Sequence, residues 1–495
     1  MSAIITKTEL QCYDPSTGKP FETVKISTSE QTENILKNSK IASKIYSEYS
    51  YNKRRKLVND FRKIIVKNQD EFIDIICKET GKKPFEALME IMVSVELMKT
   101  QARHGGKILK SKKLGTGIYL HKKGFVEFRP YGVVGIISPW NYPLILTLSP
   151  LTESLLTGNA VVLKPSEQTP VTALLLKKYF DSIADDENIF QVVCGATETG
   201  KIIVESKYTD LICFTGSTTV GKIIAKSCGA QLKPCILELG GKDAMMVLED
   251  ANLSRAIKAC VWGGFSNAGQ TCISVERVYL SETIYDNFID SLKLELKHLS
   301  SGPNSNNLIG AMTMKSGLEK VNAQIEEVRN LGTTIISYNT SNEPLNGQFI
   351  QPTIIINPPN YSDINNKETF GPVITIHKIS DEKDGITKIN SSEFGLSASV
   401  FTKNFHRGKK IAQQIEAGMV CVNDALVGYA LPNFPFGGFK NSGLGRVHGK
   451  EGLLAFCQPV SIIGNRITLP KEIWWFDLST RFYKIMKRFI RFWYG

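Results

Sequence analysis

A cysteine, a carboxylate and an amide in this sequence stand in surroundings that suit the chemistry of carbonyl groups. Cys272 follows the segment NAGQT (267–271), whose small and polar residues are typical of an exposed turn where a thiol nucleophile can be reached. Glu238 precedes Leu-Gly-Gly, and the two glycines let the backbone approach a ligand closely. Asn141 lies in the segment PWNYP, where two prolines restrict the loop that carries its amide. Because the chain has ten cysteines, residue type alone does not single out Cys272.

A glycine-containing segment, FTGSTTVGK (214–222), is a candidate phosphate site. Gly216 and Gly221 have the spacing of a phosphate-binding loop, but Ile223 stands where a nucleotidase needs Ser or Thr for magnesium, which disfavours an NTPase. An apolar run ends at Gly216 and Ser217 can cap a following helix, whose N-terminus would attract a phosphate. The alternative interpretation is a plain turn between a strand and a helix.

A second candidate for ligand contact follows the apolar run NAVVL (159–163). Lys164, Ser166 and Glu167 come at its end, and the carboxyl ends of parallel strands are where α/β folds bind ligands. Lys164 and Glu167 could reach two hydroxyls of one ribose, and Glu167 would repel a 2′-phosphate. The pair therefore favours NAD over NADP, although it would also suit a solvated turn.

The elements that must position these residues follow from hydrophobic periodicity. Residues 28–104 predict three amphipathic helices, the first opening with a capping box from Thr28 to Gln31. Gly81 and the pair Gly105 and Gly106 are predicted helix stops. From residue 131, short apolar runs alternate with helix-length segments, and a second such series follows residue 243. Two α/β domains with parallel sheets are the simplest arrangement.

Two segments interrupt this pattern. Residues 117–132 predict a β-hairpin inserted before the first sheet strand. Between Arg129 and Glu153 there is no charged residue, which could suggest a membrane span. Several prolines inside it favour buried strand, loop and helix instead.

The composition is that of an ordinary globular chain of 495 residues, with 42% hydrophobic and 22% charged residues, which excludes disordered and collagen-like classes. Sixty basic against 48 acidic residues leave a net charge of +12, which suggests a polyanionic partner such as nucleic acid or an anionic membrane. The cysteines form no CxxC pair and the six histidines no cluster, so neither disulfides nor a metal site is expected. The N-terminus has no secretory signal, and we expect a cytoplasmic protein.

Taken together, the motifs resemble those of the NAD(P)-dependent aldehyde dehydrogenase superfamily in content, order and spacing, over about residues 5–462. The matching segments are PWNYP (139–143), LKPSE (163–167), FTGSTTVG (214–221), LELGGK (237–242), NAGQTC (267–272), ETFGP (368–372) and PFGGFKNSGLGR (435–446). The resemblance implies an α/β fold with a Rossmann-like NAD-binding domain, an α/β catalytic domain and a bridging β-hairpin element that builds homodimers or homotetramers. The NAD-binding domain is expected at residues 1–116 and 133–241, the catalytic domain at 242–457, and the oligomerisation element at 117–132 and 458–470.

The resemblance also implies roles for individual residues. Cys272 would attack the aldehyde as a thiolate, Asn141 with the Cys272 backbone N–H would form the oxyanion hole, and Glu238 would be the general base that activates water. No metal is required. Cofactor contacts are implied for Trp140, Lys164, Ser166, Glu167, Gly216, Ser217, Gly221, Leu239, Glu368 and Phe370. Two departures are Asp243, where the family often has Ser or Asn, and Lys367 before Glu368.

Glu238 separates branches of the superfamily, because those that transfer the acyl group to coenzyme A generally lack this base. Its presence favours hydrolysis to a free acid. The segment 423–430 is mostly apolar and offers no Arg for a second carboxylate, which favours an apolar aldehyde over succinate semialdehyde. A coenzyme A-acylating enzyme and a non-catalytic, membrane-associated scaffold remain the alternatives. Every recognisable site suits a dinucleotide and a carbonyl, so nucleic acid is not an expected partner.

The resemblance fades near residue 463, and the tail 471–495 predicts a basic amphipathic helix. Its six basic and two acidic residues give +4 of the net charge. At 100° per residue the large apolar residues fall on one side and the basic ones on the other. The apolar side consists of Phe482, Ile485, Met486, Phe489, Phe492 and Trp493, and the basic side of Arg481, Lys484, Lys487, Arg488 and Arg491. Such a helix could bind an anionic membrane surface from the cytoplasmic side, or pack on the body or on a partner subunit.

Overall fold

The computed structural model of the chain describes residues 3–338, 347–472, 474–476 and 479–495. Residues 473, 477 and 478 of the predicted tail therefore lie outside the described residues. The chain forms two compact units, one made of Met1–Leu109 with Arg129–Gln458 and one of Lys110–Phe128 with Pro459–Gly495. The expected boundary between a cofactor domain and a catalytic domain, at residues 241 and 242, stays a prediction. It falls inside the first unit, between strands of two different sheets.

The first unit begins with a small antiparallel sheet and a group of helices. The strands are β1 (Ile4–Ile5), β2 (Glu9–Tyr13) and β3 (Pro20–Lys25), and the helices are α1 (Ser29–Ser47), α2 (Tyr51–Lys67), α3 (Gln69–Thr80) and α4 (Pro84–Ile108). Four helices thus replace the three predicted ones. The capping box of Thr28 and Gln31 is present at the start of α1, and Gly81 ends α3 in the left-handed conformation, as predicted.

The prediction that Gly105 and Gly106 stop a helix is wrong, because α4 continues to Ile108. The glycines serve packing instead. The hydroxyl of Tyr51 donates a hydrogen bond of 2.8 Å to the carbonyl of Ala102, and a Cβ on Gly105 would lie 2.6 Å from that hydroxyl. Absence of a side chain at Gly105 therefore lets α2 and α4 approach closely.

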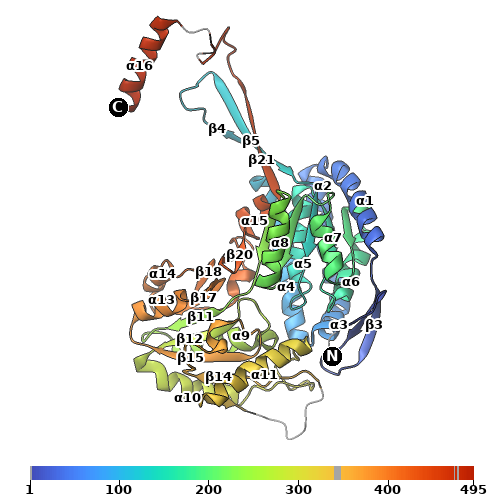
Figure 1. Cartoon of the computed structure of the whole chain (residues 1–495), viewed down its shortest axis with the longest axis vertical. Coiled ribbons are helices and arrows are strands. Elements are labelled where there is room, and N and C mark those ends of the chain that lie inside the picture. Colours follow the sequence, from blue (N-terminus) through green and yellow to red (C-terminus); the bar gives the residue numbers. More distant parts are fainter. Residues whose placement is uncertain (1–2, 339–346, 473, 477–478) are drawn as a thin grey trace. The chain divides into compact units, whose positions relative to one another are not determined.

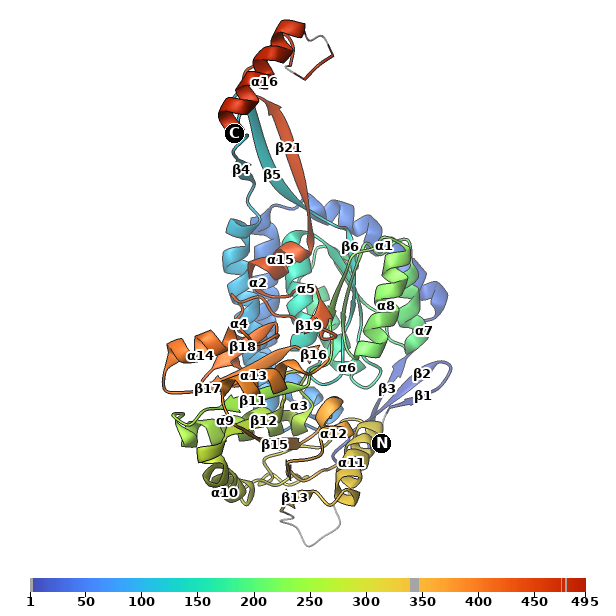
Figure 2. The same cartoon turned by 60° about the vertical axis from the view of Figure 1, so that its left-hand side comes forward.

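A six-stranded sheet forms the first α/β layer, in the order β20-β10-β9-β6-β7-β8, parallel except for β20. Figure 2 shows α2, α4 and α5 on one side of this sheet and α1, α7 and α8 on the other. The strands are β6 (Val133–Ile137), β7 (Ala160–Lys164), β8 (Phe190–Val192), β9 (Leu211–Thr215), β10 (Cys235–Glu238) and β20 (Gly443–Leu444). The helices are α5 (Ile145–Thr157), α6 (Pro170–Asp181), α7 (Thr197–Glu205) and α8 (Thr218–Ala230).

A seven-stranded sheet forms the second layer, in the order β13-β14-β15-β12-β11-β17-β18, with only β13 antiparallel (Figure 1). Its strands are β11 (Asp243–Val247), β12 (Val275–Ser281), β13 (Thr334–Ser337), β14 (Thr353–Ile356), β15 (Val373–Ile379), β17 (Ser397–Phe401) and β18 (Met419–Val422). The helices around it are α9 (Leu253–Phe265), α10 (Tyr285–Leu296), α11 (Lys315–Asn330), α12 (Asp363–Asn366), α13 (Glu382–Asn390) and α14 (Phe405–Ala412). Strands β16 (Phe394–Gly395) and β19 (Phe439–Lys440) pair separately, and α15 (Gly449–Ala455) follows.

The second unit contains a β-hairpin and the tail. The hairpin begins earlier than the predicted range 117–132, because its first strand lies before residue 117 and residues 117–121 belong to the connection between its strands. Strands β4 (Lys112–Leu114) and β5 (Lys122–Pro130) are antiparallel, and β21 (Cys457–Asn465) completes the sheet in the order β21-β5-β4. The Glu472 carboxylate pairs with the ammonium of Lys122 and, at 2.8 Å, with the His121 ring. Helix α16 (Thr480–Tyr494) is capped by Ser479, and none of its residues is buried.

The uncharged segment between Arg129 and Glu153 forms β6, a loop and most of α5, all within the first unit, and α5 is buried along its whole length. In the described parts of the chain, no helix combines the length and the apolar character that crossing a membrane requires.

Candidate active site

Four strands of the first sheet end in residues that the sequence singled out. Asn141 follows β6, Lys164 ends β7, the Gly216 turn follows β9 and Glu238 ends β10. Strands β6 and β9 are neighbours, and the chain adds β7 and β8 beside β6 but β10 beside β9, so the strand order reverses between them. Parallel α/β sheets bind ligands at the carboxyl ends of the strands at such a switch point. The sheet therefore brings together residues up to almost one hundred positions apart in the sequence.

Cys272 is carried by a strained turn between α9 and β12. Asn267, Ala268 and Gly269 all have left-handed backbones, with φ of 51°, 53° and 70°. Such conformations cost energy for residues other than glycine and accumulate at functional sites. A Cβ on Gly269 would overlap the carbonyl of Gly371, so this position requires glycine.

The Asn141 side chain lies against the same turn. Its Nδ2 donates to the carbonyl of Gln270 at 2.9 Å, and its backbone oxygen accepts from Nδ2 of Asn267 at 3.0 Å. The backbone oxygen also accepts from the Lys82 ammonium at 2.9 Å. The Asn141 amide is therefore bonded to the carbonyl of Gln270, which precedes Cys272 by two residues in the turn.

Glu238 is buried, with 5% of its surface exposed, and neither carboxylate oxygen has a hydrogen-bond partner among the described residues. It lines a small cavity together with Cys272, of about 10 Å³, which suits a single water molecule. Burial raises the pKa of the Glu238 carboxyl well above its usual range, although the nearby Arg446 guanidinium opposes the rise. A carboxyl with a raised pKa next to a water site can act as a base.

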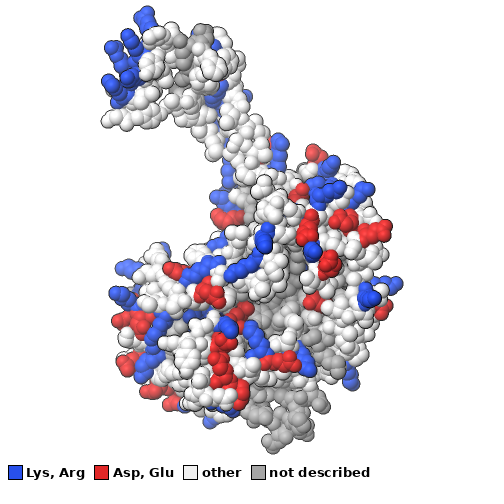
Figure 3. Space-filling model, in the orientation of Figure 1, with Lys and Arg blue, Asp and Glu red and all other residues white. Residues whose placement is uncertain are grey.

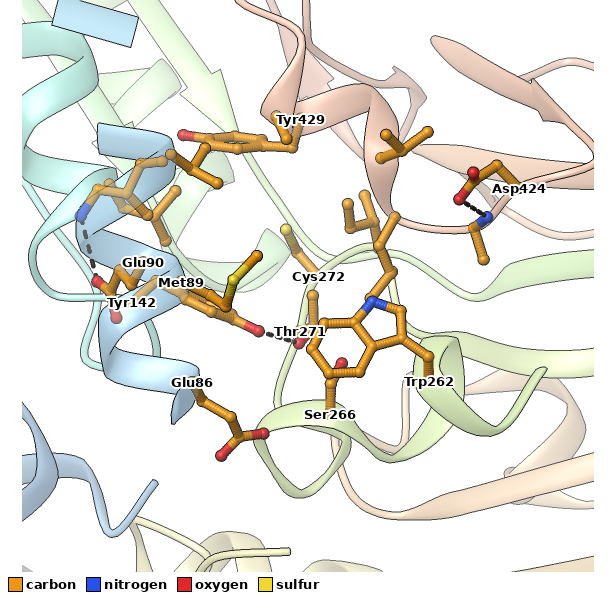
Figure 4. Close-up of a pocket in the computed structure, with 18 residues that line it drawn as sticks. Glu86, Met89, Glu90, Tyr142, Trp262, Ser266, Thr271, Cys272, Asp424 and Tyr429 are labelled. Carbon is orange, nitrogen blue, oxygen red and sulfur yellow. Dashed lines mark hydrogen bonds between the residues drawn. The ribbon is translucent and has the colours of Figure 1, made fainter. Parts of the chain in front are cut away.

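A larger cavity of about 320 Å³, which we call the Cys272 cavity, also has Cys272 in its lining. In Figure 4 the side chains of Met89, Trp262 and Tyr429 surround the Cys272 sulfur. The cavity is lined by residues of α4, the loop before α5, α9, the Cys272 turn and the segment 424–430. The sequence had pointed to the last two of these.

Three carboxylates border the Cys272 cavity, and each has a partner. Glu90 pairs with Lys82 at 2.6 Å, and Asp424 with Arg255 at 3.0 Å. Glu86 accepts hydrogen bonds from the backbone N–H groups of Lys83 and Asn267. None of the described lining residues is Lys or Arg, so the interior of the cavity is mainly apolar.

The Cys272 thiol is held in its neutral form. Burial raises its pKa, and the carboxyls of Asp243, Glu368 and Glu238 add to the rise. The reactive thiolate therefore requires that a base accept the proton.

The predicted cofactor residues line the same edge. The Lys164 ammonium lies 3.7 Å from the Glu167 carboxylate, and Ser166 Oγ accepts from the N–H of Gln168 at 3.2 Å. Ser217 caps α8 by accepting from the N–H of Val220. A Cβ on Gly221 would overlap the buried Leu239, so this glycine allows α8 to pack on the strand end.

The remaining three predicted contacts come from two loops. Glu368 accepts from the backbone N–H of Gly241 at 3.0 Å, and burial and the neighbouring Glu276 raise its pKa to about 7. Phe370, with φ of 58°, meets Trp140 edge to face at 5.5 Å between ring centroids. Among the described residues, no three His, Cys, Asp or Glu side chains are placed to hold a metal ion.

Comparison with known proteins decides the family. The model of the aldehyde dehydrogenase family matches residues 4–462. This chain belongs to the aldehyde dehydrogenase family.

Relatives of known name agree with the assignment. A 4,4′-diapolycopene aldehyde oxidase of Methylomonas sp. is 34% identical over 493 residues, covering 99% of this chain and 92% of the relative. A Mycolicibacterium smegmatis protein, provisionally named as a succinate-semialdehyde dehydrogenase using NADP+, is 32% identical and covers 91% of this chain and 88% of its own length. A Mycobacterium tuberculosis aldehyde dehydrogenase solved with NAD+ has a TM-score of 0.88 at 32% identity, covering 94% and 96% of the two chains.

As an aldehyde dehydrogenase, the chain has the expected α/β fold and is an enzyme, not a scaffold. Lys82, Glu90 and Trp262 were missed by the sequence analysis. Lys82 and Glu90 belong to no motif, and Trp262 falls on an ordinary amphipathic helix. Only packing brings them to the site.

Proposed function

We propose that this aldehyde dehydrogenase oxidises an apolar aldehyde to its carboxylic acid with NAD+. The observation that carries the proposal is that Cys272 lines two cavities, the apolar Cys272 cavity and the small one that holds Glu238. An aldehyde in the first cavity and a water in the second would both lie beside the Cys272 side chain.

In the first step the Cys272 thiol gives up its proton to solvent, the sulfur bonds to the carbonyl carbon as the carbon–oxygen π bond opens, and the carbonyl oxygen takes the negative charge. Nδ2 of Asn141 has two protons, of which one is bonded to Gln270, so the second can donate to this oxygen. The backbone N–H of Cys272 would be the other donor. Fixed donors stabilise the charge as it develops and cost no reorganisation.

The predicted cofactor residues fit a dinucleotide. Ser217 and the N-terminus of α8 present backbone N–H groups where a pyrophosphate would bind. At Gly216, in the turn before them, a Cβ would collide with the Phe214 ring, which favours glycine at this position. Lys164 and Glu167 would hold the adenine ribose, and Glu368 with Phe370 the nicotinamide end. When bound, NAD+ accepts the hydride from the substrate carbon, which leaves an acyl group on the sulfur.

Glu238 then serves hydrolysis of the thioester. Its unpaired carboxylate takes a proton from water, the hydroxide adds to the acyl carbon, and the carbon–sulfur bond breaks to release the acid. Its raised pKa makes it a strong enough base for this task. Branches of the superfamily that use coenzyme A generally lack this base, so its presence supports hydrolysis over acyl transfer.

The Glu238→Gln variant tests this assignment. It should still release one NADH per active site in a burst and then stop, because acylation is retained and deacylation is lost. Cys272→Ser should release none. Acyl-coenzyme A as the main product in the presence of coenzyme A would replace hydrolysis with acyl transfer, and steady turnover by Glu238→Gln would remove Glu238 from the mechanism.

The apolar lining also supports the substrate class. Relatives' names include both 4,4′-diapolycopene aldehyde and succinate semialdehyde. Succinate semialdehyde carries a carboxylate in addition to its aldehyde group, and the Cys272 cavity offers no described cation to bind that carboxylate. A kcat/KM for succinate semialdehyde above that for octanal would contradict the proposal.

We also propose that α16 binds an anionic membrane surface. None of its residues is buried, and apolar side chains such as Ile485 and Trp493, which are 53% and 58% exposed, are not covered by the part of the chain that the structure describes. Its Lys and Arg side chains gather along one side (Figure 3). Apolar insertion beside basic residues is the pattern of an interfacial helix.

Sedimentation with vesicles tests this contact. The protein should pellet with phosphatidylglycerol vesicles and not with phosphatidylcholine vesicles, and Lys484→Glu with Arg488→Glu should weaken binding at least tenfold. The matched control is Lys37→Glu with Lys44→Glu on the exposed side of α1. Equal binding by the α16 variant, or no pelleting at all, would favour packing of α16 on another subunit.

A further inference from the structure

A second cavity adjoins the Cys272 cavity and is larger, at about 760 Å³. We call it the distal chamber. It is lined by α9, by the connection from α3 into α4 and by the segment 299–309. Glu86, Trp262 and Ser266 line both cavities, so these three side chains form the wall between them. Both cavities belong to the first unit of the chain.

Large apolar side chains of the distal chamber remain exposed. Phe85 is 62% exposed, Leu308 59% and Trp262 44%. Leaving such side chains in water is unfavourable, and contiguous exposed apolar residues mark surfaces that bind something apolar. Trp262 links this surface directly to the space around Cys272.

The lysines at the distal chamber are already engaged. Lys78 pairs with Asp74 at 2.7 Å, and Lys82 pairs with Glu90. The Lys83 ammonium donates to the carbonyls of Gly302 and Asn304 at 2.7 and 3.0 Å. These three cations are therefore engaged within the protein, and the other charged lining residues are the carboxylates of Asp14, Asp74 and Glu86. Such a lining disfavours an anionic ligand and leaves the exposed apolar side chains as the contact surface.

We propose that the distal chamber receives the far part of an aldehyde whose apolar chain is too long for the Cys272 cavity. This inference rests on the proposed function, since it assigns the substrate class of the same site. At about 320 Å³ the Cys272 cavity is near the lower end of the roughly 300–1,000 Å³ typical of small-molecule sites. The reacting carbonyl would lie at Cys272 and the chain would pass Trp262 into the distal chamber.

A series of straight-chain aldehydes tests the inference. In the unmodified enzyme, kcat/KM should continue to rise from butanal through octanal to hexadecanal, by up to roughly fourfold for each methylene that becomes buried. The double variant Phe85→Asp with Leu308→Asp should lower the hexadecanal-to-butanal ratio of kcat/KM at least tenfold. Phe85 lies in the first turn of α4, where an acidic residue is well tolerated, so folding should be preserved.

Ile45→Asp is the matched control, because Ile45 is a 59% exposed apolar residue on α1 and lines neither cavity. It should leave the hexadecanal-to-butanal ratio unchanged. A rise in kcat/KM that ends at octanal, or an unchanged ratio in the double variant, would overturn the inference while leaving the proposed function intact. Failure of every aldehyde to yield NADH would instead overturn the proposed function.

Discussion

Lys82 and Glu90 form an ion pair at 2.6 Å with both side chains completely buried. Each partner also holds the loop that carries Asn141. The Lys82 ammonium donates to the Asn141 carbonyl, and the Glu90 carboxylate accepts from the N–H groups of Leu144 and Ile145 at the start of α5. The pair thus connects α4 to the amide that we propose as the oxyanion donor.

Lys82→Met should destabilise the protein by about 3–5 kcal/mol, because it leaves the Glu90 carboxylate buried and unpaired. Urea unfolding measures the loss. Lys63→Met, which removes an exposed pair with Asp60, should cost less than about 1 kcal/mol. The double variant Lys82→Met with Glu90→Gln should lose less than the sum of the single variants, and strict additivity would show that the pair is not coupled.

The pH dependence of kcat/KM should have a limb that rises with pH. Burial raises the pKa of both the Cys272 thiol and the Glu238 carboxyl, and the proposed reaction needs both groups deprotonated. Lowering the pH below either pKa therefore removes the active form. Activity at saturating NAD+ should increase from pH 6 to pH 9, and a flat profile over this range would contradict the assignment.

Glu167→Ser should shift the cofactor preference toward NADP+. The Glu167 carboxylate lies 3.7 Å from Lys164 at the end of β7, where it would repel a 2′-phosphate. Removing it should raise the NADP+-to-NAD+ ratio of kcat/KM by about tenfold, or about 1.4 kcal/mol. The control is Glu187→Ser. Glu187 is exposed and lies just before β8, so it is at the edge of the sheet opposite to the carboxyl ends of the strands. An unchanged ratio in Glu167→Ser would remove Glu167 from the ribose site.

Gly105→Ala should destabilise the packing of α2 on α4. The new methyl group would lie 2.6 Å from the Tyr51 hydroxyl, and such overpacking costs about 1–3 kcal/mol, more than the roughly 1 kcal/mol that alanine gains over glycine in a helix. Tyr51→Phe removes the clashing oxygen. Thermal unfolding of the double variant should therefore show a smaller loss than the sum of the two single changes, and an additive loss would argue against the clash.

Much of the site could be predicted because its residues follow strands. Lys164, Gly216 and Glu238 come directly after apolar runs, and parallel strands end at one edge of their sheet. Helix ends were predicted less well. Gly81 ends α3 in a left-handed conformation, whereas α4 continues past Gly105. The sequence could not distinguish the two cases, because a glycine can either adopt a left-handed backbone or make room for a neighbouring side chain such as Tyr51.

The sequence by itself determined the family, the two α/β layers and the turn before Cys272, because each depends on local patterns and on motif order. The expectation that this turn is exposed is wrong, since residues 267–271 are buried by the elements packed around them. The tertiary structure alone decided that Lys82 reaches Asn141, 59 residues away, and that Trp262 divides two cavities. Contacts between distant elements depend on how whole helices pack, and no local spacing of residues encodes them. The two cavities beside Trp262 therefore depend on packing, whereas the motifs depend on the sequence alone.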